Sequence, residues 1–276
     1  MVALVTTQTF WDVNGTELNR YCWNIETLGG GRSSVPKFRG DNTTLAYRPG
    51  SRHEAKTTDA RILPLRMWVS SLLDTGVEAL VRDEQYEANL RALRGLFWRD
   101  DAAQVPLTKR WREGGAILSA TALVELVSDM APTMAGPFTG SLDVDLLLAD
   151  PWFYTAQQTV NVPVSGTPTV VNNTGDARTT GYGCQLEFVG PLTNPQLTNG
   201  SVWVKVGTSI ATGDKVTLDL WDWTALRDLD GANLIGAVQH SGARQWMPLE
   251  IGANSLVLSV SSGTGSVNVK YRLPRF

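Results

Sequence analysis

Residues 142–155 read LDVDLLLADPWFYT. The apolar side chains at positions 142, 144, 146 and 148 alternate with others, which predicts a β-strand that is buried on one face. Pro151 follows within three residues, and proline cannot continue a central strand because it has no backbone N–H. We therefore predict that one domain, residues 1–155, ends here and that a second, residues 156–276, begins.

The distribution of charge changes at the same place. Residues 1–155 carry 16 basic and 19 acidic side chains, whereas residues 156–276 carry 8 of each. The whole chain of 276 residues has a net charge of -3, and only 18% of its residues are charged, against about 25% in ordinary soluble domains. Phosphate binding needs clustered Lys and Arg, so this balance argues against a nucleic-acid-binding protein.

The first domain combines strands with one helix. Residues 61–71 and 116–127 alternate in the same way as 142–148, which predicts further strands. Between them, Tyr86, Leu90, Leu93 and Phe97 are spaced as one apolar stripe of a helix over about residues 83–98. A helix with one such stripe packs on a sheet, so we expect a β-rich α+β domain.

The second domain contains only short alternating runs. They cover residues 159–164, 185–189, 201–206, 215–221, 255–260 and 266–272. Turn-forming residues separate them, at 172–175, 198–200, 212–214 and 263–265. Short strands at this spacing predict an antiparallel β-sandwich, so the protein as a whole is expected to be mainly β.

Several classes of site and segment are not expected. The N-terminus has no basic and apolar leader, and no run of about 18 apolar residues predicts a membrane span. Cys22 and Cys184 are expected to be free core thiols, although a disulfide between them stays possible. With His53 and His240 as the two histidines and no CxxC motif, we expect no metal site and no cofactor.

The sequence also lacks the usual signatures of catalysis. GxSxG, GxxxxGK[ST] and HExxH are absent. Asp143 and Asp145 share a strand face, as a metal-binding or glycosidase pair would, but the solvated face of an amphipathic strand is the favoured interpretation. Residues 228–233 (DLDGAN) fail the EF-hand pattern, and Gly29–Gly31 and Arg39–Asp41 are expected in loops or turns. We therefore expect a protein that is not an enzyme.

Four tryptophans are the candidate binding residues. The alternation places Trp68, Trp203, Trp221 and Trp223 on the outer faces of their strands, with the last two on a strand that continues to residue 223. Three interpretations stay open: a platform on which sugar rings stack, a protein–protein interface, which is commonly rich in Trp, or a surface that a loop or the other domain covers.

Three segments resemble parts of the distal tail proteins of long, flexible-tailed, siphovirus-type bacteriophages. They are residues 37–50 (KFRGDNTTLAYRPG), residues 149–154 (ADPWFY), and the ordered C-terminal set 245–249 (QWMPL), 252–256 (GANSL) and 267–272 (VNVKYR). Ala46 stands where many relatives have proline, and residues 190–230 match nothing in the family. The resemblance spans most of the chain as an ordered series of short motifs.

The resemblance implies a minor tail protein with a structural role in the virion. In that family the N-terminal domain forms a ring, usually of six copies, and a galectin-like or carbohydrate-module-like sandwich follows it. The ring is a hub at the tail tip, or baseplate. It joins the tail tube protein to the tape measure protein, fibres and receptor-binding proteins, with no catalytic residue, cofactor, nucleic acid or membrane insertion. The protein would be made in the host cytoplasm.

Two other functions can be derived from the same residues. The second domain could be a carbohydrate-binding module that contacts host cell-wall glycans through Trp203, Trp221 and Trp223. A glycan hydrolase that uses Asp143 and Asp145, or the acidic residues at positions 219–230, is disfavoured, because a solvated strand face and a turn are the favoured interpretations of these residues.

Overall fold

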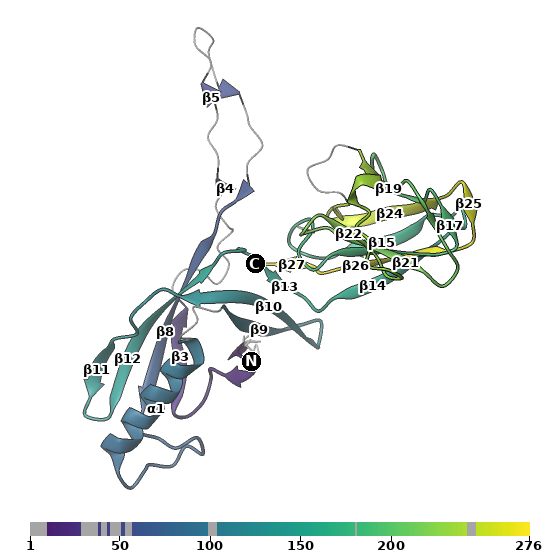
Figure 1. Ribbon diagram of the computed structural model, residues 1–276. Helices are drawn as coiled ribbons and strands as arrows, with labels where there is room; N and C mark the ends of the chain where they lie inside the picture. The colour runs from purple at the N-terminus through teal and green to yellow at the C-terminus, as the bar shows by residue number, and fades with distance from the viewer. Residues whose placement is uncertain are drawn as a thin grey trace. The chain divides into compact units, whose positions relative to one another are not determined.

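The computed structural model describes residues 10–28, 38–39, 43–44, 51–52, 57–98, 104–179, 181–241 and 247–276. The chain is mainly β and divides into two compact units, residues 1–153 with residue 276, and residues 154–275 (Figure 1). In the described part of the chain, no helix has the length and apolar character that a membrane crossing requires.

Unit 1 is built on one antiparallel sheet. Its strands follow the order β2 (Thr16–Glu17), β1 (Phe10–Val13), β9 (Val105–Glu113), β10 (Ala116–Leu126), β12 (Thr139–Leu148), β8 (Arg61–Ser70) and β3 (Trp23–Leu28). A further strand, β11 (Pro132–Gly136), pairs with the first residues of β12. The three strands predicted from alternation are therefore present, and they lie close together in the middle of this sheet.

The helix α1 (Arg82–Phe97) packs on one face of the sheet, as its apolar stripe predicts (Figure 1). Tyr86, Leu90, Leu93 and Phe97 are buried in one core with the inward side chains of β8. A polar contact fixes the middle of the helix, because buried Asn89 donates to the carbonyl oxygens of Ser70 (2.7 Å) and Leu72 (2.8 Å). The helix is thus tied to the end of β8 by both packing and hydrogen bonds.

The chain between β3 and β8 contains two short antiparallel ladders. β4 (Phe38–Arg39) pairs with β7 (Thr57–Thr58), and β5 (Thr43–Thr44) pairs with β6 (Ser51–Arg52). Most of the 37–50 motif, the glycines at 29–31, the Gly and Asp of the 39–41 tripeptide, and His53 lie outside the described residues.

Unit 2 is an antiparallel β-sandwich. One sheet has the order β14 (Gln158–Pro163), β26 (Ser266–Tyr271), β16 (Gln185–Val189), β21 (Lys215–Asp219) and β22 (Thr224–Arg227). The other has β15 (Thr169–Asn173), β24 (Gly252–Ser259), β18 (Gln196–Asn199), β19 (Val202–Val206) and β23 (Val238–His240). The inward side chains of both sheets, such as Phe188 and Val204, form one core. The sandwich predicted from the short alternating runs is confirmed.

The remaining elements are short. β17 (Leu192–Thr193) pairs with both β20 (Ser209–Ile210) and β25 (Ser262–Gly263) in a small third sheet of unit 2. The 3-10 helix η1 (Ile235–Ala237) precedes β23, β13 (Phe153–Tyr154) spans the boundary between the units, and β27 (Pro274–Arg275) is the last strand.

Several predicted strand ends are wrong. The strand expected to reach residue 221 or 223 ends at Asp219, because the Asp219 carboxylate accepts the backbone N–H groups of Trp221 (2.9 Å) and Asp222 (3.0 Å) and turns the chain. The turns expected at residues 172–175 and 198–200 begin later, since Asn173 is still paired in β15 and Asn199 in β18. At Asp219 a side chain, rather than the apolar pattern, determines where the strand ends.

Unit 2 begins and ends on neighbouring strands. Gln158 of β14 lies opposite Tyr271 of β26, and the Thr155 N–H donates to the carbonyl oxygen of Leu273 at 3.1 Å. The Thr155 hydroxyl in turn accepts the Leu273 N–H at 3.1 Å. The segments through which the chain enters and leaves this unit therefore lie next to each other.

Candidate functional site

Two exposed tryptophans of the sandwich lie on the turn between β21 and β22. Trp221 is 48% exposed and Trp223 is 45% exposed. The Asp219 carboxylate that holds this turn also accepts a hydrogen bond from Gln185 Nε2 at 3.1 Å. The turn is thus anchored to the neighbouring strand β16, and its tryptophans are presented from a fixed backbone.

Trp221 is the outermost ring of an aromatic row. Its ring lies 5.6 Å from that of Tyr182 in an edge-to-face arrangement, and Tyr182 lies 4.8 Å from buried Tyr154. Gly181 and Gly183, on either side of Tyr182, have positive φ angles of 92° and 60°, which favour glycine. Because the Trp221 and Tyr182 rings are perpendicular and Tyr154 is buried, the exposed Trp221 ring is the part of the row that could stack on a sugar ring or receive a partner's side chain.

Trp223 has a partly structural position. Its own φ is 56°, in the left-handed region, and its ring lies 6.5 Å from that of His240. Trp223 directly precedes β22 and His240 is the last residue of β23. Both strands are edge strands of the two large sheets. The contact therefore joins the open edges of the sandwich, although almost half of Trp223 is still in solvent.

The other two predicted tryptophans are less accessible. Trp203 on β19 is half-buried, and its backbone is bound to Ser241 through two hydrogen bonds of 3.0 and 3.3 Å. Trp68 is half-buried on β8 of unit 1, between Asn24 and Ser141 in the ladder. The structure therefore brings together Trp221 and Trp223 in one turn. Sequence reasoning missed Tyr182, although its two flanking glycines are a signal for an aromatic residue presented by a loop.

The acidic residues considered for chemistry have structural or solvated positions. Asp143 is exposed and lies 4.0 Å from Arg66 Nε, its cross-strand partner. Asp145 lies opposite Pro64, and its backbone N–H is bound by Ser128. Residues 228–233 form a turn in which the Asp230 carboxylate accepts the Ala232 N–H at 3.0 Å. Over the described residues, no group of three His, Cys, Asp or Glu side chains is placed to hold a metal ion.

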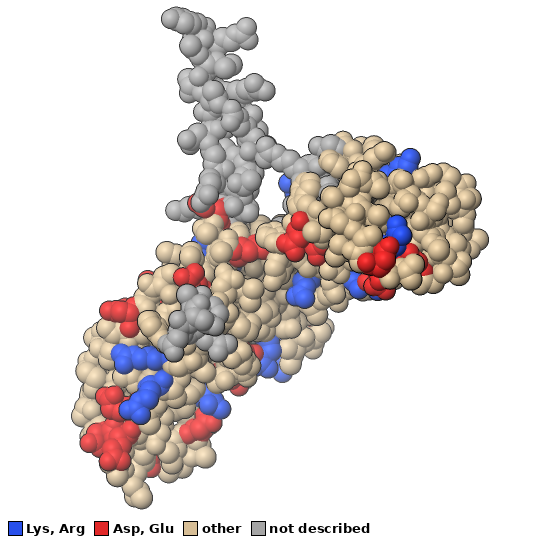
Figure 2. Space-filling view, viewed as in Figure 1, with Lys and Arg blue, Asp and Glu red and all other residues tan. Residues whose placement is uncertain are grey.

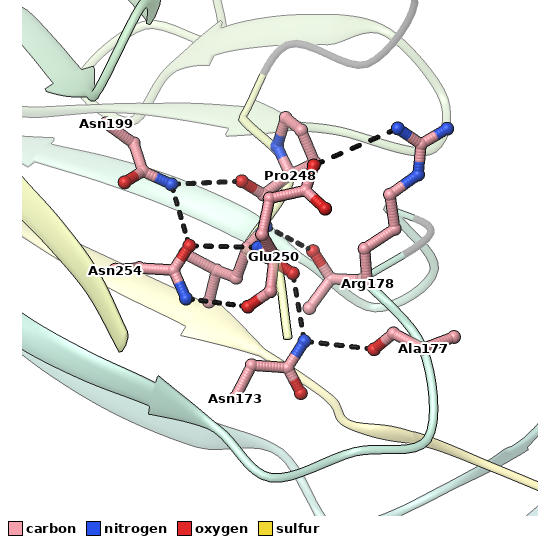
Figure 3. A network of polar contacts seen from close by, with 9 residues as sticks. Asn173, Ala177, Arg178, Asn199, Pro248, Glu250 and Asn254 are labelled. Atoms are coloured by element: carbon pink, nitrogen blue, oxygen red, sulfur yellow. Dashed lines mark hydrogen bonds and ion pairs between the residues drawn. The ribbon is translucent and has the colours of Figure 1, made fainter. Parts of the chain in front are cut away.

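A buried network of amides supports the sheet of unit 2 that contains β15, β18 and β24 (Figure 3). Asn254 is 3% exposed, and its side chain accepts the Glu250 N–H at 2.9 Å and donates to the Glu250 carbonyl oxygen at 2.8 Å. Asn199 Nδ2 links Asn254 Oδ1 (3.0 Å) to the Pro248 carbonyl oxygen (3.2 Å). Asn173 Nδ2 donates to the carbonyl oxygens of Ala177 and Leu249 at 3.0 and 2.9 Å. The amides satisfy the irregular backbone before β24, so their role is structural.

One carboxylate, on strand β16 of unit 2, lies close to two lysines. Glu187 Oε1 lies 2.7 Å from Lys270 Nζ and 3.9 Å from Lys215 Nζ. Burial by itself would raise the pKa of Glu187, but the hydrogen bond and charge of Lys270, with smaller contributions from Asn268 and Lys215, outweigh it and lower the pKa below its ordinary value. Glu187 is therefore held ionised in a ladder of polar side chains, as a structural ion pair.

Both cysteines are buried free thiols, one in each unit. Burial raises the pKa of Cys184 to about 11, and burial together with Asp74 raises the pKa of Cys22. A thiol of high pKa is a poor nucleophile, because the thiolate is the reactive form. Neither cysteine has the environment of a catalytic residue.

No protein-family model and no curated protein matches the chain. Several solved structures match the chain. The crystal structure of the Dit protein of phage SPP1, described as a paradigm of the hub adsorption apparatus in phages that infect Gram-positive bacteria, has a TM-score of 0.65 at 17% identity. The match covers 96% of this chain and 99% of that one.

Two structures of the phage p2 baseplate in its activated conformation are also similar. The one with strontium has a TM-score of 0.40 and covers 95% of this chain and 98% of its own. The one with calcium has a TM-score of 0.39 and covers 96% and 98%. Both are 8% identical and too distant to bear on the fold. The match to SPP1 Dit spans both units, and it confirms the resemblance found in the sequence: this chain has the fold of a phage Dit hub protein.

Proposed function

We propose that this protein is a structural component of a bacteriophage tail tip, a distal tail protein whose unit 1 assembles into a ring of six copies. The ring would join the tail tube protein to the tape measure protein, the tip hub or fibres, and the receptor-binding proteins. Its location would be the virion, after synthesis in the host cytoplasm. Its role would be assembly, with no catalytic step.

One observation carries this proposal: the Dit fold extends over both units and almost the whole of both chains. The site geometry agrees with it. The described acidic residues are solvated, ion-paired or in turns, the thiols are buried, and the accessible features are aromatic and apolar surfaces of the kind found in interfaces.

The proposal is tested by the oligomeric state and by location. The purified chain should form closed rings, seen by light scattering coupled to size exclusion and by negative-stain electron microscopy. An antibody against it should label the tip of the virion tail. A strictly monomeric chain at high concentration, together with absence from virions, would refute the proposal.

A second function, glycan binding by unit 2, is favoured by the aromatic row that ends in exposed Trp221. Cell-wall pull-down and glycan arrays should then show binding that Trp221→Ala abolishes and Trp223→Ala weakens. Trp98→Ala is the matched control, since Trp98 is 63% exposed but belongs to unit 1. Binding unchanged in Trp221→Ala, or absent from the wild type, removes this function.

A further inference from the structure

An apolar surface lies on the loop between β8 and α1 of unit 1. Leu73, Val77, Leu80 and Val81 are 37%, 60%, 105% and 50% exposed, and Tyr21 beside them is 64% exposed. Single exposed apolar side chains are common, but a group of them usually marks an interaction surface. We call these five residues the loop surface.

Hydrogen bonds and packing hold the Leu73–Val77 part of the loop surface. The Leu73 N–H donates to the Val77 carbonyl oxygen at 2.9 Å, and the Gly76 N–H donates to Leu73 at 2.8 Å. The Tyr21 ring lies so close to Gly76 that a Cβ there would be 3.2 Å from it. Asn89 closes the base of the loop through its bonds to Ser70 and Leu72. Because the backbone is already ordered, a partner would bind at a small entropic cost.

Acidic side chains surround the loop surface. Residues 72–87 contain five acidic side chains, Asp74, Glu78, Asp83, Glu84 and Glu87, and one basic side chain, Arg82. Glu78 is paired with Arg82, and Asp74 is paired with Arg20. Figure 2 shows acidic side chains gathered over the end of unit 1 at which α1 begins. A partner for this surface should therefore be apolar and basic.

The turn between β9 and β10 has that character. Gly114 and Gly115 form the turn, with φ angles of 58° and 85°. Ile117, 64% exposed, lies directly opposite Arg112 in the ladder, so the two side chains share a face, and Arg110 is two residues further along the same strand. Arg110 is already paired with Asp12 at 2.7 Å, so we call Arg112 and Ile117 the tip surface.

The two surfaces lie at opposite ends of the sheet. β8 is antiparallel to β12, and β12 is antiparallel to β10, so β8 and β10 run in the same direction. The loop surface follows the end of β8, whereas the tip surface is at the start of β10. Strands of this length separate their ends by about 30 Å. The two surfaces of one copy therefore cannot contact each other, and a complementary contact requires a second copy.

We propose that the loop surface of one copy docks on the tip surface of the next, with Leu80 against the face that carries Ile117 and the acidic rim facing Arg112. Two unlike surfaces at opposite ends give a head-to-tail contact, which forms a ring when the rotation between copies closes. The inference rests on the proposed ring and names the contact between its subunits.

Two apolar substitutions test the contact in the full-length chain. Leu80→Ser and Ile117→Ser should each weaken self-association about 10- to 100-fold in analytical ultracentrifugation, as expected for losing one buried aliphatic side chain. Leu229→Ser is the matched control, because Leu229 is 76% exposed in unit 2. Near-UV circular dichroism checks that each variant keeps the wild-type fold.

A charge exchange gives the sharper test. Asp83→Lys/Glu84→Lys and Arg112→Glu should each assemble poorly alone. A 1:1 mixture should form rings again, with alternating subunits in even number, because every contact then pairs opposite charges.

The outcomes separate this inference from the proposed function. Rings of wild-type protein that both serine variants leave intact, with no rescue in the mixture, would overturn the docking contact and leave the hub function standing. A closed two-fold dimer that either serine variant dissociates would support the contact and refute the ring. A monomeric wild type would refute both.

Discussion

Replacing Asn254 by alanine should destabilise unit 2 through the backbone groups that its side chain binds. The substitution removes the acceptor of the Glu250 N–H and the donor to the carbonyl oxygens of Glu250 (2.8 Å) and Gly252 (3.0 Å). Asn199 loses its hydrogen bond to Asn254 Oδ1 but keeps the one to the Pro248 carbonyl oxygen. Each buried polar group left without a partner costs about 1–3 kcal/mol. Glu250 is itself exposed, so water reaches part of its backbone, and we expect a total loss of about 2–4 kcal/mol.

Differential scanning calorimetry of the full chain measures this loss. For a unit of the size of residues 154–275, each kcal/mol lowers Tm by about 3–5 °C, so the transition of unit 2 should fall by roughly 6–20 °C. The transition of unit 1 should not move, since Asn254 lies in the other core.

The matched control is Asn161→Ala. Asn161 also makes two side-chain hydrogen bonds, to Ser266 at 2.9 Å and Asn268 at 2.8 Å, but on the exposed face of β14. This change should cost less than about 0.5 kcal/mol. The reasoning is refuted if Asn254→Ala is as stable as the wild type, or if the two alanine variants lose the same stability.

Three further predictions follow from buried side chains. Leu93→Ala, at a fully buried helix position, should cost about 2–5 kcal/mol in the unit 1 transition only; equal loss in both transitions would contradict separate cores. Glu187, whose pKa is lowered by Lys270, contributes stability above its ordinary pKa of 4.5 and loses it as pH falls through its folded-state pKa. The Tm of unit 2 should thus fall less on acidification in Glu187→Gln. Cys22 and Cys184, both buried with raised pKa values, should react with a thiol reagent at pH 8 only after denaturant is added; rapid labelling of native protein would show that they are accessible.

The elements with a long apolar period could be predicted from the sequence. The stripe from Tyr86 to Phe97 located α1 to within one residue at each end. The alternation in β8, β10 and β12 gave the correct inward faces, because burial on one face requires a period of two. Two-residue strands such as β17 have no period to detect, and they form only where other strands bring their partners close.

The candidate site was harder to predict because side chains and distant contacts form it. The alternation continues through Trp221, but the Asp219 carboxylate binds the following N–H groups and ends the strand. The amide network joins Asn173, Asn199 and Asn254, which are far apart in the sequence. Each looks like a turn residue in isolation, and only the packed sheet shows that all three side chains bind the backbone of residues 248–250.

The neighbouring strands at which the chain enters and leaves unit 2 make this unit exchangeable. Thr155 and Leu273 are bonded to each other, so a replacement module needs only two ends about 5 Å apart to be spliced in at the same joint. Recombination could replace or remove the sandwich in one event, while the sheet and helix of unit 1 stay under separate selection. Any binding surface that the sandwich carries would then change independently of unit 1.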